Sequence, residues 1–302
     1  MINKEFSTPF DTNLYNLRSL SSEAGILSLR RSCEISEMCD ISLAIAKDYY
    51  KDGLGIYEIL SIISEDLPLA RGNSDQAVIS DRVTFSSLFL ERIRALGISL
   101  TEESFLPAAR LSESFVYVKN HLSDEAYDVF SQEFYDPRVR YVSTIKEAVK
   151  AVNDGDATYC LLPLEERGGA RLSTVTELIF GNDLKIDSVT PVFGQDGCAD
   201  MKYALASKAF SIPEIYEDDD RYLEICLDVS GEVTLSEILT AADLLKILPY
   251  RVNTVVFYTE DGQKTNYSIV FKGEGKDYSD LLIYLTLFCG TYVPIGIYKN
   301  LE

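Results

Sequence analysis

Residues 1–110 carry apolar side chains at three- and four-residue steps, the spacing of helices that bury one face. Four residues with this spacing are Ile35, Met38, Ile41 and Ile45. The polar run 69–76 interrupts the pattern, and a second amphipathic stretch, 83–97, ends at a glycine. A glycine in this place is typical of a helix C-terminus. The pattern therefore predicts an N-terminal helical region.

From residue 113 the pattern changes to short runs of β-branched and aromatic residues, which indicate strands. The expected strands are 114–118, 140–143 and 157–163. Thr144 with Glu147, and Thr174 with Glu177, have the spacing of capping boxes at helix starts, and a glycine follows each of these helices. Strands that alternate with capped helices predict an α/β layer with a mainly parallel sheet.

The last 80 residues follow the order β-α-β-β-α-β, which is that of a ferredoxin-like module. The first helix of this module has one apolar face, formed by Leu235, Ile238, Leu239 and Ala242. An acidic run, Glu217–Asp220, precedes the module. The run lacks the alternating oxygen ligands and the glycine of a calcium loop, so it is interpreted as a solvated linker.

Composition narrows the functional classes. The 302 residues, 46% hydrophobic and 25% charged, describe a soluble protein of two or three domains. The net charge of −20 disfavours nucleic acid and anionic membranes as partners. No apolar run is long enough to span a bilayer, and the first ten residues have no signal-peptide core. We therefore expect a cytoplasmic location.

The six cysteines have no CxxC spacing, and three of them, Cys160, Cys226 and Cys289, lie in apolar runs as expected for buried free thiols. His121 is the one histidine. Zinc sites and catalytic triads are usually built with histidine, so both are disfavoured. The sequence predicts no metal and no cofactor.

Ligands of α/β sheets bind beyond the carboxyl ends of the strands, and polar residues follow two of the expected strands. After the first strand these are Lys119, Asn120, His121 and Ser123. After the third strand come Glu165, Glu166 and Arg167, with Arg171, Ser173 and Thr174 at the entry to the next helix. Free N–H groups at a helix N-terminus suit a carboxylate, so a small carboxylate ligand is expected. An ion pair between Glu166 and Arg167 that reshapes the cleft is an equal alternative.

The stretch NDGDATYCLLPLEERGGARLSTVTELI, residues 153–179, resembles the prephenate dehydratase domain found in bifunctional chorismate mutase–prephenate dehydratases. In that family a G-x-A-D-Y step leads into a strand ending P-I-E-N-[ST], and a capped helix follows. The ending VPIGIYKN, 293–300, resembles the end of the ACT domain of the same family at Gly296 and Tyr298. The segments LYNLRSL, LAIAK and FLERIRALG resemble chorismate mutase more distantly.

The resemblance implies a multi-domain protein of the α/β and α+β classes. Its parts would be helices over 1–110, a periplasmic-binding-protein-like α/β domain over 111–212 and a ferredoxin-like ACT domain over 220–302. It further implies a role in phenylalanine biosynthesis, prephenate or an aromatic amino acid as ligand, and a homodimer formed through the ACT-like domain.

Several positions depart from the family pattern. Glu166 stands for the family's asparagine and Arg167 for its serine or threonine, while Met201-Lys202-Tyr203 is the best counterpart of its T-R-F motif. A thioether cannot protonate a departing hydroxyl, so Lys202, Tyr203 and Thr174 remain as catalytic candidates. The family's α/β domain has two lobes, and one of them is reduced or missing here. The ACT-like part lacks the glutamate-serine-arginine-proline turn associated with phenylalanine binding.

Three hypotheses follow. The first is a non-catalytic homologue that binds a small carboxylate or has a regulatory or assembly role. The second is an active dehydratase that converts prephenate to phenylpyruvate, water and CO₂. The third is a chorismate mutase activity in the N-terminal helices, for which Arg18, Arg30, Arg31, Lys47, Arg92 and Arg94 are the available cations.

Overall fold

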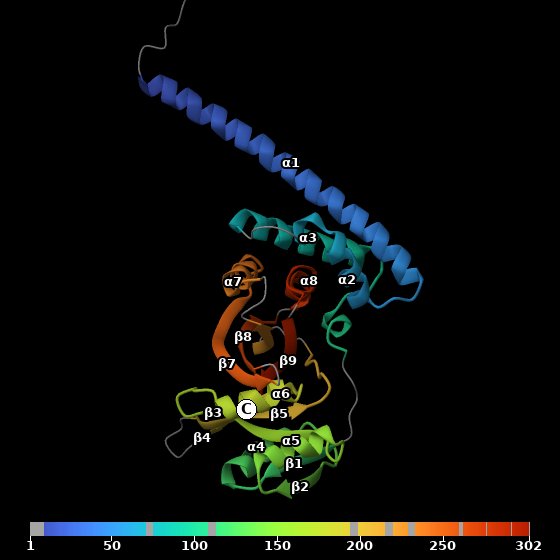
Figure 1. The fold of residues 1–302 in the computed structure, drawn as a ribbon, viewed down its shortest axis with the longest axis vertical. Helices are drawn as coiled ribbons and strands as arrows, with labels where there is room; N and C mark the ends of the chain where they lie inside the picture. Colours follow the sequence, from blue (N-terminus) through green and yellow to red (C-terminus); the bar gives the residue numbers. More distant parts are fainter. Residues whose placement is uncertain are drawn as a thin grey trace, which may run out of the picture.

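The protein combines one large mixed β-sheet with helices on its faces and at one end (Figure 1). The computed structural model describes residues 9–70, 75–107, 113–193, 199–214, 220–228, 233–259, 262–275, 277–290 and 292–301. The helices are α1 Pro9–Lys51, α2 Ile56–Asp66, α3 Gln76–Ala95, α4 His121–Ser131, α5 Ile145–Asn153, α6 Ser173–Gly181, α7 Leu235–Leu244 and α8 Ser279–Phe288, with 3₁₀ turns η1 Pro68–Ala70 and η2 Glu102–Ser104. The strands are β1 Ser114–Val118, β2 Arg138–Val142, β3 Tyr159–Glu166, β4 Lys185–Phe193, β5 Ala199–Ser207, β6 Asp220–Asp228, β7 Leu248–Thr259, β8 Gly262–Glu274 and β9 Tyr292–Asn300.

The nine strands lie in the order β2-β1-β3-β5-β4-β9-β6-β8-β7. The pairs β1–β2 and β1–β3 are parallel, whereas β5 runs antiparallel to both β3 and β4. The predicted strands β1–β3 are parallel, as expected, and β4 runs in the same direction. β5 alone is reversed in this half, so the whole sheet is mixed. The helix α4 covers one face of this part, and α5 and α6 cover the other.

The last four strands form an antiparallel ferredoxin-like unit in the order β9-β6-β8-β7, and the predicted β-α-β-β-α-β order is confirmed. Its helices α7 and α8 bury the predicted apolar face, including Ile238 and Ala242. The acidic run expected to be a linker falls partly outside the described residues. Its last member, Asp220, begins β6 and pairs with Lys272 at 2.8 Å.

A parallel pairing between β4 and β9 joins the two halves of the sheet. Ser188 pairs with Lys299, and the Leu301 backbone N–H donates to the Val189 carbonyl at 2.7 Å. A Cβ atom on Gly296 would lie 2.3 Å from the Ile186 carbonyl oxygen, so only glycine allows the strands this close. The sheet is thus continuous across the two parts that the sequence separates.

The helices α2 and α3 lie on α7 and α8, and α1 lies on α2 and α3, at the end of the molecule away from β1 and β2 (Figure 1). The buried apolar residues in the described part of α1 are Ile35, Cys39, Leu43 and Ala46, and Ser42 is buried beside them. Ile41 and Ile45 were expected on this buried face, but they are 57% and 37% exposed. The expectation fails because α1 carries two apolar stripes, and the four-residue spacing does not say which one faces the core.

Two buried ion pairs fasten the helices to the ferredoxin-like unit. Arg82 of α3 pairs with Glu237 of α7, and Arg221 of β6 pairs with Glu102 of η2. All four side chains are at most 5% exposed. Removing one partner of such a pair would leave an uncompensated buried charge, so these contacts hold the two parts in one arrangement.

Of the two capping boxes predicted from the sequence, one is confirmed and one is wrong. The Thr144 hydroxyl accepts from the Glu147 backbone N–H at 3.2 Å, which confirms the first capping box. The second is wrong, because the N-cap of α6 is Leu172, two residues before Thr174. Gly97 and Gly155 adopt φ values of +79° and +77° just beyond α3 and α5, as expected for C-terminal glycines.

The expected free thiols Cys160, Cys226 and Cys289 are buried, as is Cys39. Burial raises the pKa of Cys160 to about 12, so this thiol stays protonated at neutral pH. Among the described residues, no helix is both long enough and apolar enough to cross a bilayer.

Candidate functional site

The loop after β3 is a tight turn that carries charged residues to the junction between the two halves of the sheet. The Gly169 N–H donates to the Glu166 carbonyl, and the Glu166 N–H donates to the Ala170 carbonyl, both at 2.9 Å. Gly168 and Gly169 have φ values of +88° and +81°, a conformation that glycine adopts without strain. The turn brings Arg171 back beside Glu165 in an antiparallel bridge.

Glu165 lies in the middle of this junction and is 8% exposed. Its Oε1 accepts from Nη1 of Arg251, a residue of β7. Its Oε2 lies 3.8 Å from Nζ of Lys202, the residue that faces it across the β3–β5 pairing. The carboxylate is therefore shared between a cation of its own sheet half and a cation of the ferredoxin-like unit.

A second carboxylate, Glu224 of β6, completes the group and is fully buried. It accepts hydrogen bonds from Arg171 at 2.9 Å, Ser268 at 2.9 Å and Tyr298 at 3.1 Å. Burial and the neighbouring Glu224 raise the pKa of Tyr298 well above its usual value. The tyrosine therefore remains a hydrogen-bond donor to Glu224 at every physiological pH.

These five side chains, Glu165, Arg171, Lys202, Glu224 and Arg251, are called the junction cluster below. Three cations face two carboxylates, which leaves one positive charge in excess. The adjoining cavity, bounded by Leu164, Tyr222, Tyr250 and Asn300 among others, has a volume of about 10 Å³. A cavity of that size holds about one water molecule. The cluster is filled by its own ion pairs and has no room for an organic ligand.

The comparisons with known proteins concern the fold. No protein-family model and no curated protein matches the chain. A prephenate dehydratase from Streptococcus mutans superposes with a TM-score of 0.51 at 12% identity, over 63% of this chain and 100% of that one. Prephenate dehydratases from Arthrobacter aurescens, in complex with L-Phe, and from Staphylococcus aureus both give a TM-score of 0.44 over 62% of this chain. They are 14% and 10% identical to it, and 90% and 100% of their own chains are covered.

The chain has a prephenate dehydratase-like fold. The likeness rests on the arrangement of strands and helices, because identities of this order carry little information about individual residues. Within this fold, the position of each predicted site residue comes from the structure itself.

The prephenate dehydratase-like fold does not bring the residues after β1 to the junction cluster. Asn120 caps α4 by accepting from the Ser123 N–H at 3.0 Å. Lys119 lies over the ring of Tyr141, with 4.5 Å between its Nζ and the ring centroid. His121 is 83% exposed and contacts Glu125 at 2.9 Å. These residues lie on the α4 side, whereas the cluster lies on the opposite face.

The catalytic candidates after β3 and on β5 are also separated. Lys202 belongs to the cluster, but its neighbour Tyr203 points to the α4 face, where it is buried and bonded to Asn120. Burial raises the pKa of Tyr203, which makes this phenol a weaker acid. Ser173 and Thr174 are exposed at the start of α6.

Glu166 is exposed, and Arg167 pairs with Asp200 at 3.3 Å. The sequence offered an ion pair between Arg167 and Glu166 as an alternative. In the structure, Arg167 instead contacts Asp200 of the neighbouring strand β5. The contact is itself exposed, and a pair of this kind contributes little to stability.

Sequence reasoning missed Glu224 and Arg251, and it named Arg171 only as a supporting cation. A signal for Glu224 was present, because it interrupts the apolar run YLEICL of a buried strand. A charged residue in such a run needs a buried partner. The sequence holds no comparable signal for Arg251, whose partner Glu165 lies 86 residues away.

Four of the six cations considered for chorismate mutase are engaged elsewhere; Lys47 is exposed, and the side chain of Arg18 lies outside the described part of the structure. Arg30 pairs with Glu34, Arg31 with Asp81, Arg92 with Asp40 and Arg94 with Asp277. In the described part of the chain, no group of three or more His, Cys, Asp or Glu side chains is placed to hold a metal ion.

Proposed function

We propose that this protein is a non-catalytic, prephenate dehydratase-like protein of aromatic amino-acid metabolism with a regulatory or assembly role. One observation carries the proposal. The strand-end position expected to receive the substrate is occupied by the ion pair between Glu165 and Arg251, beside a cavity of about 10 Å³.

The chemistry supports this reading. Conversion of prephenate to phenylpyruvate removes a hydroxyl and a carboxylate, so the hydroxyl needs a proton donor. Met201 stands at the family's threonine position and has no proton to give. Lys202 is next to it but lies beside Glu165, and Tyr203 points to the other face of the sheet. At the junction cluster, therefore, no proton donor and carboxylate-binding cation face an open space large enough for prephenate.

The net charge of the junction cluster limits the charge of a ligand that could bind there. Prephenate has two carboxylates, whereas the junction cluster has one positive charge in excess. A ligand with one carboxylate, such as an aromatic amino acid, would match that charge, but it would have to displace Glu165 from Arg251. Ligand binding at the cluster thus requires the two halves of the sheet to separate.

The C-terminal unit supports a regulatory role. Its strand order is that expected for an ACT-like domain, and we propose that it fulfils this role and contributes to a homodimer. The absence of the glutamate-serine-arginine-proline turn argues that any effector is bound differently from phenylalanine in the family. A cytoplasmic location fits this proposal.

An active dehydratase is the second candidate, favoured by the direct pairing of Glu165 with Lys202 across β3 and β5. The test is phenylpyruvate formation from prephenate, followed by absorbance at neutral pH for the wild type and for Lys202→Ala. We expect both rates to equal the spontaneous rate. A faster wild-type rate that Lys202→Ala abolishes would establish the dehydratase instead. Thermal stabilisation by phenylalanine, measured in parallel, tests the regulatory ligand separately.

A further inference from the structure

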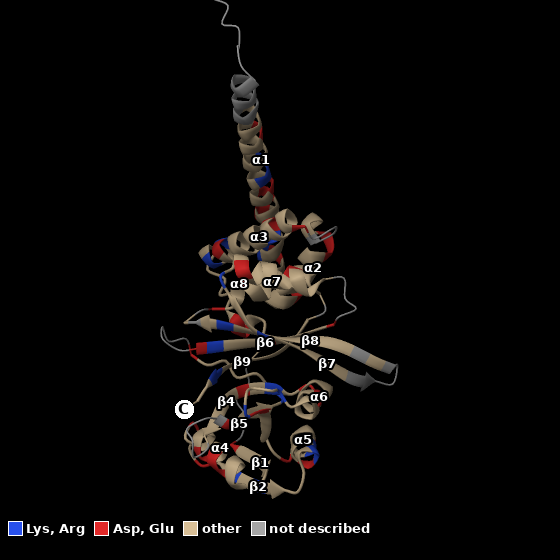
Figure 2. Ribbon diagram, turned by 90° about the vertical axis from the view of Figure 1, so that its left-hand side faces the viewer, with Lys and Arg blue, Asp and Glu red and all other residues tan. Residues whose placement is uncertain are grey.

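The N-terminal half of α1 stands away from the rest of the molecule. Every residue from 19 to 34 is exposed, and Figures 1 and 2 show α1 extending as a rod beyond α2 and α3. The exposed side chains include Leu20 at 63% and Leu27 at 65%. A polar helix could remain solvated in this way, but large apolar side chains in such numbers indicate a partner.

Six apolar and two charged residues of α1 form a stripe with alternating four- and three-residue steps, whereas exposed Ile26 and Leu29 lie off it. Its members are Leu20, Ala24, Leu27, Arg31, Glu34, Met38, Ile41 and Ile45. This is the heptad spacing of helices that pack against another helix along their length. The stripe borders the buried face that α1 presents to its own chain: Met38 packs partly on the core, and Arg31 pairs with Asp81 of α3.

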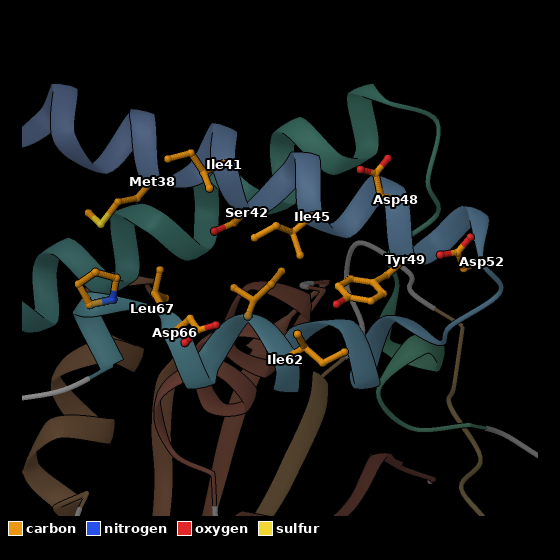
Figure 3. A pocket seen from close by; sticks show the side chains of 12 residues that line it. Met38, Ile41, Ser42, Ile45, Asp48, Tyr49, Asp52, Ile62, Asp66 and Leu67 are labelled. Carbon is orange, nitrogen blue, oxygen red and sulfur yellow. The ribbon is translucent and has the colours of Figure 1, made fainter.

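The C-terminal half of the stripe borders an open apolar groove between α1 and α2 (Figure 3). The groove has a volume of about 530 Å³. It is lined by Met38, Ile41, Ser42, Ile45, Asp48, Tyr49, Asp52, Ile62, Ile63, Asp66, Leu67 and Pro68. Its three acidic residues and the absence of any cation from this lining make it unsuitable for an anionic ligand such as chorismate.

We propose that the groove receives the N-terminal half of α1 from a second copy of this chain, in an antiparallel pair related by a two-fold axis. The stripe is self-complementary in this arrangement. Leu20 of one copy would face Ile45 of the other, Ala24 would face Ile41, and Leu27 would face Met38. The two charged members, Arg31 and Glu34, fall opposite each other near the axis, where each also has an ion-pair partner in its own chain, Asp81 and Arg30 respectively. Every layer of the stripe thus meets a partner of matching character.

The ends of the helices agree with this pairing. In the antiparallel register the first turn of one α1 reaches the end of the groove that carries Asp48 and Asp52. A helix N-terminus has a positive partial charge, which these carboxylates stabilise. The stripe from Leu20 to Ile45 is about 38 Å long at 1.5 Å per residue. In the proposed two-fold pair, its whole length is covered in both copies.

The test is the mass of the full-length protein in solution at micromolar concentration. The variant carries Leu20→Glu and Leu27→Glu, two exposed positions whose replacement leaves the fold intact. Leu29→Glu is the matched control, because Leu29 is 70% exposed on the same helix but lies off the stripe. We expect the stripe variant to have half the mass of the wild type and of the control. A monomeric wild type, or a stripe variant that keeps the wild-type mass, would overturn the proposal.

A cross-link tests the register. In a Cys33→Ser background, the pair Leu20→Cys with Ile45→Cys should form an intermolecular disulfide under mild oxidation. The pair Leu29→Cys with Ile45→Cys should not. Equal cross-linking of the two pairs would rule out the proposed register. Association through the C-terminal unit is recognised separately, because it would survive the stripe variant.

Discussion

Glu165 of β3 accepts a hydrogen bond from Arg251 of β7, although the two residues lie 86 positions apart in the sequence. The pair links the two halves of the sheet, and it lies where the resemblance to prephenate dehydratases places a substrate-binding loop. The same carboxylate therefore closes the space beside the loop.

The coupling between Glu165 and Arg251 is measurable. We expect Glu165→Gln and Arg251→Met each to lower the free energy of unfolding by about 1–3 kcal/mol, because each leaves a partly buried charge without its partner. The double variant should lose less than the sum of the two. Urea unfolding measures all three. Arg167→Ala, which breaks an exposed pair, is the control and should change stability by less than about 1 kcal/mol. Strict additivity would show that the contact is absent in solution.

We expect a larger loss of stability when the contact between α3 and the ferredoxin-like unit is broken. Arg82→Met leaves Glu237 buried and unpaired, so we expect a loss of about 3–5 kcal/mol in unfolding free energy. Arg30→Met breaks an exposed pair on α1 and should change little. Similar values for the two variants would mean that α3 does not pack on α7 as described. Removal of residues 1–110 would expose the apolar faces of α7 and α8 to solvent, so we expect that truncation to be destabilising as well.

Asp187 gives the protein a pH-dependent stability. Burial raises the pKa of this carboxyl to about 7, and the hydrogen bond from Tyr159 offsets only part of the effect. The folded state therefore holds the proton more tightly than the unfolded state does. The stability contribution is complete below pH 4 and is lost as the pH rises towards 7. Unfolding free energies measured from pH 5 to 8 should fall by a few kcal/mol, at about 1.4 kcal/mol per pKa unit.

Asp187→Asn is the control for that prediction, since an amide does not titrate. The variant should have a flatter profile and should exceed the wild type in stability at pH 8. A wild-type profile parallel to that of the variant would show that Asp187 is ionised throughout.

Gly296 tests the junction of β4 and β9. A methyl group there would lie 2.3 Å from the Ile186 carbonyl oxygen, so Gly296→Ala should cost at least about 1–3 kcal/mol. Gly181→Ala is the matched control, because no atom lies within 4 Å of its added Cβ. Faster hydrogen exchange at Val189 and Leu301 would locate the damage at the junction. If Gly296→Ala is as stable as Gly181→Ala, the two strands are not in register there.

The C-terminal unit could be predicted from sequence because its strands and helices have clear periodicities, and turn residues separate them. The structure explains why glycine and tyrosine occupy the two positions on which the resemblance of the C-terminal unit rests. Gly296 permits the close approach of β9 to β4, and Tyr298 donates to Glu224. The pattern thus pointed to residues that hold the sheet together.

The rest could not be predicted, because it depends on partners distant in sequence. Backbone pairing of β4 with β9 leaves no trace in side-chain pattern. Ile41 and Ile45 have the spacing of a helix core, and no local rule shows that Cys39 and Leu43 are buried in their place. The candidate site failed for a related reason: a strand end indicated Lys119 and the family motif indicated Lys202, but the fold places the two residues on opposite faces.

The central claim is that the ion pairs of the junction cluster occupy the position of a substrate. Calorimetric titration of the wild-type protein with prephenate, at neutral pH and up to millimolar concentration, tests it most directly. We predict no saturable heat. Saturable binding that Lys202→Ala abolishes, while Arg167→Ala leaves it unchanged, would show that the cluster opens to receive a dicarboxylate and would contradict the account.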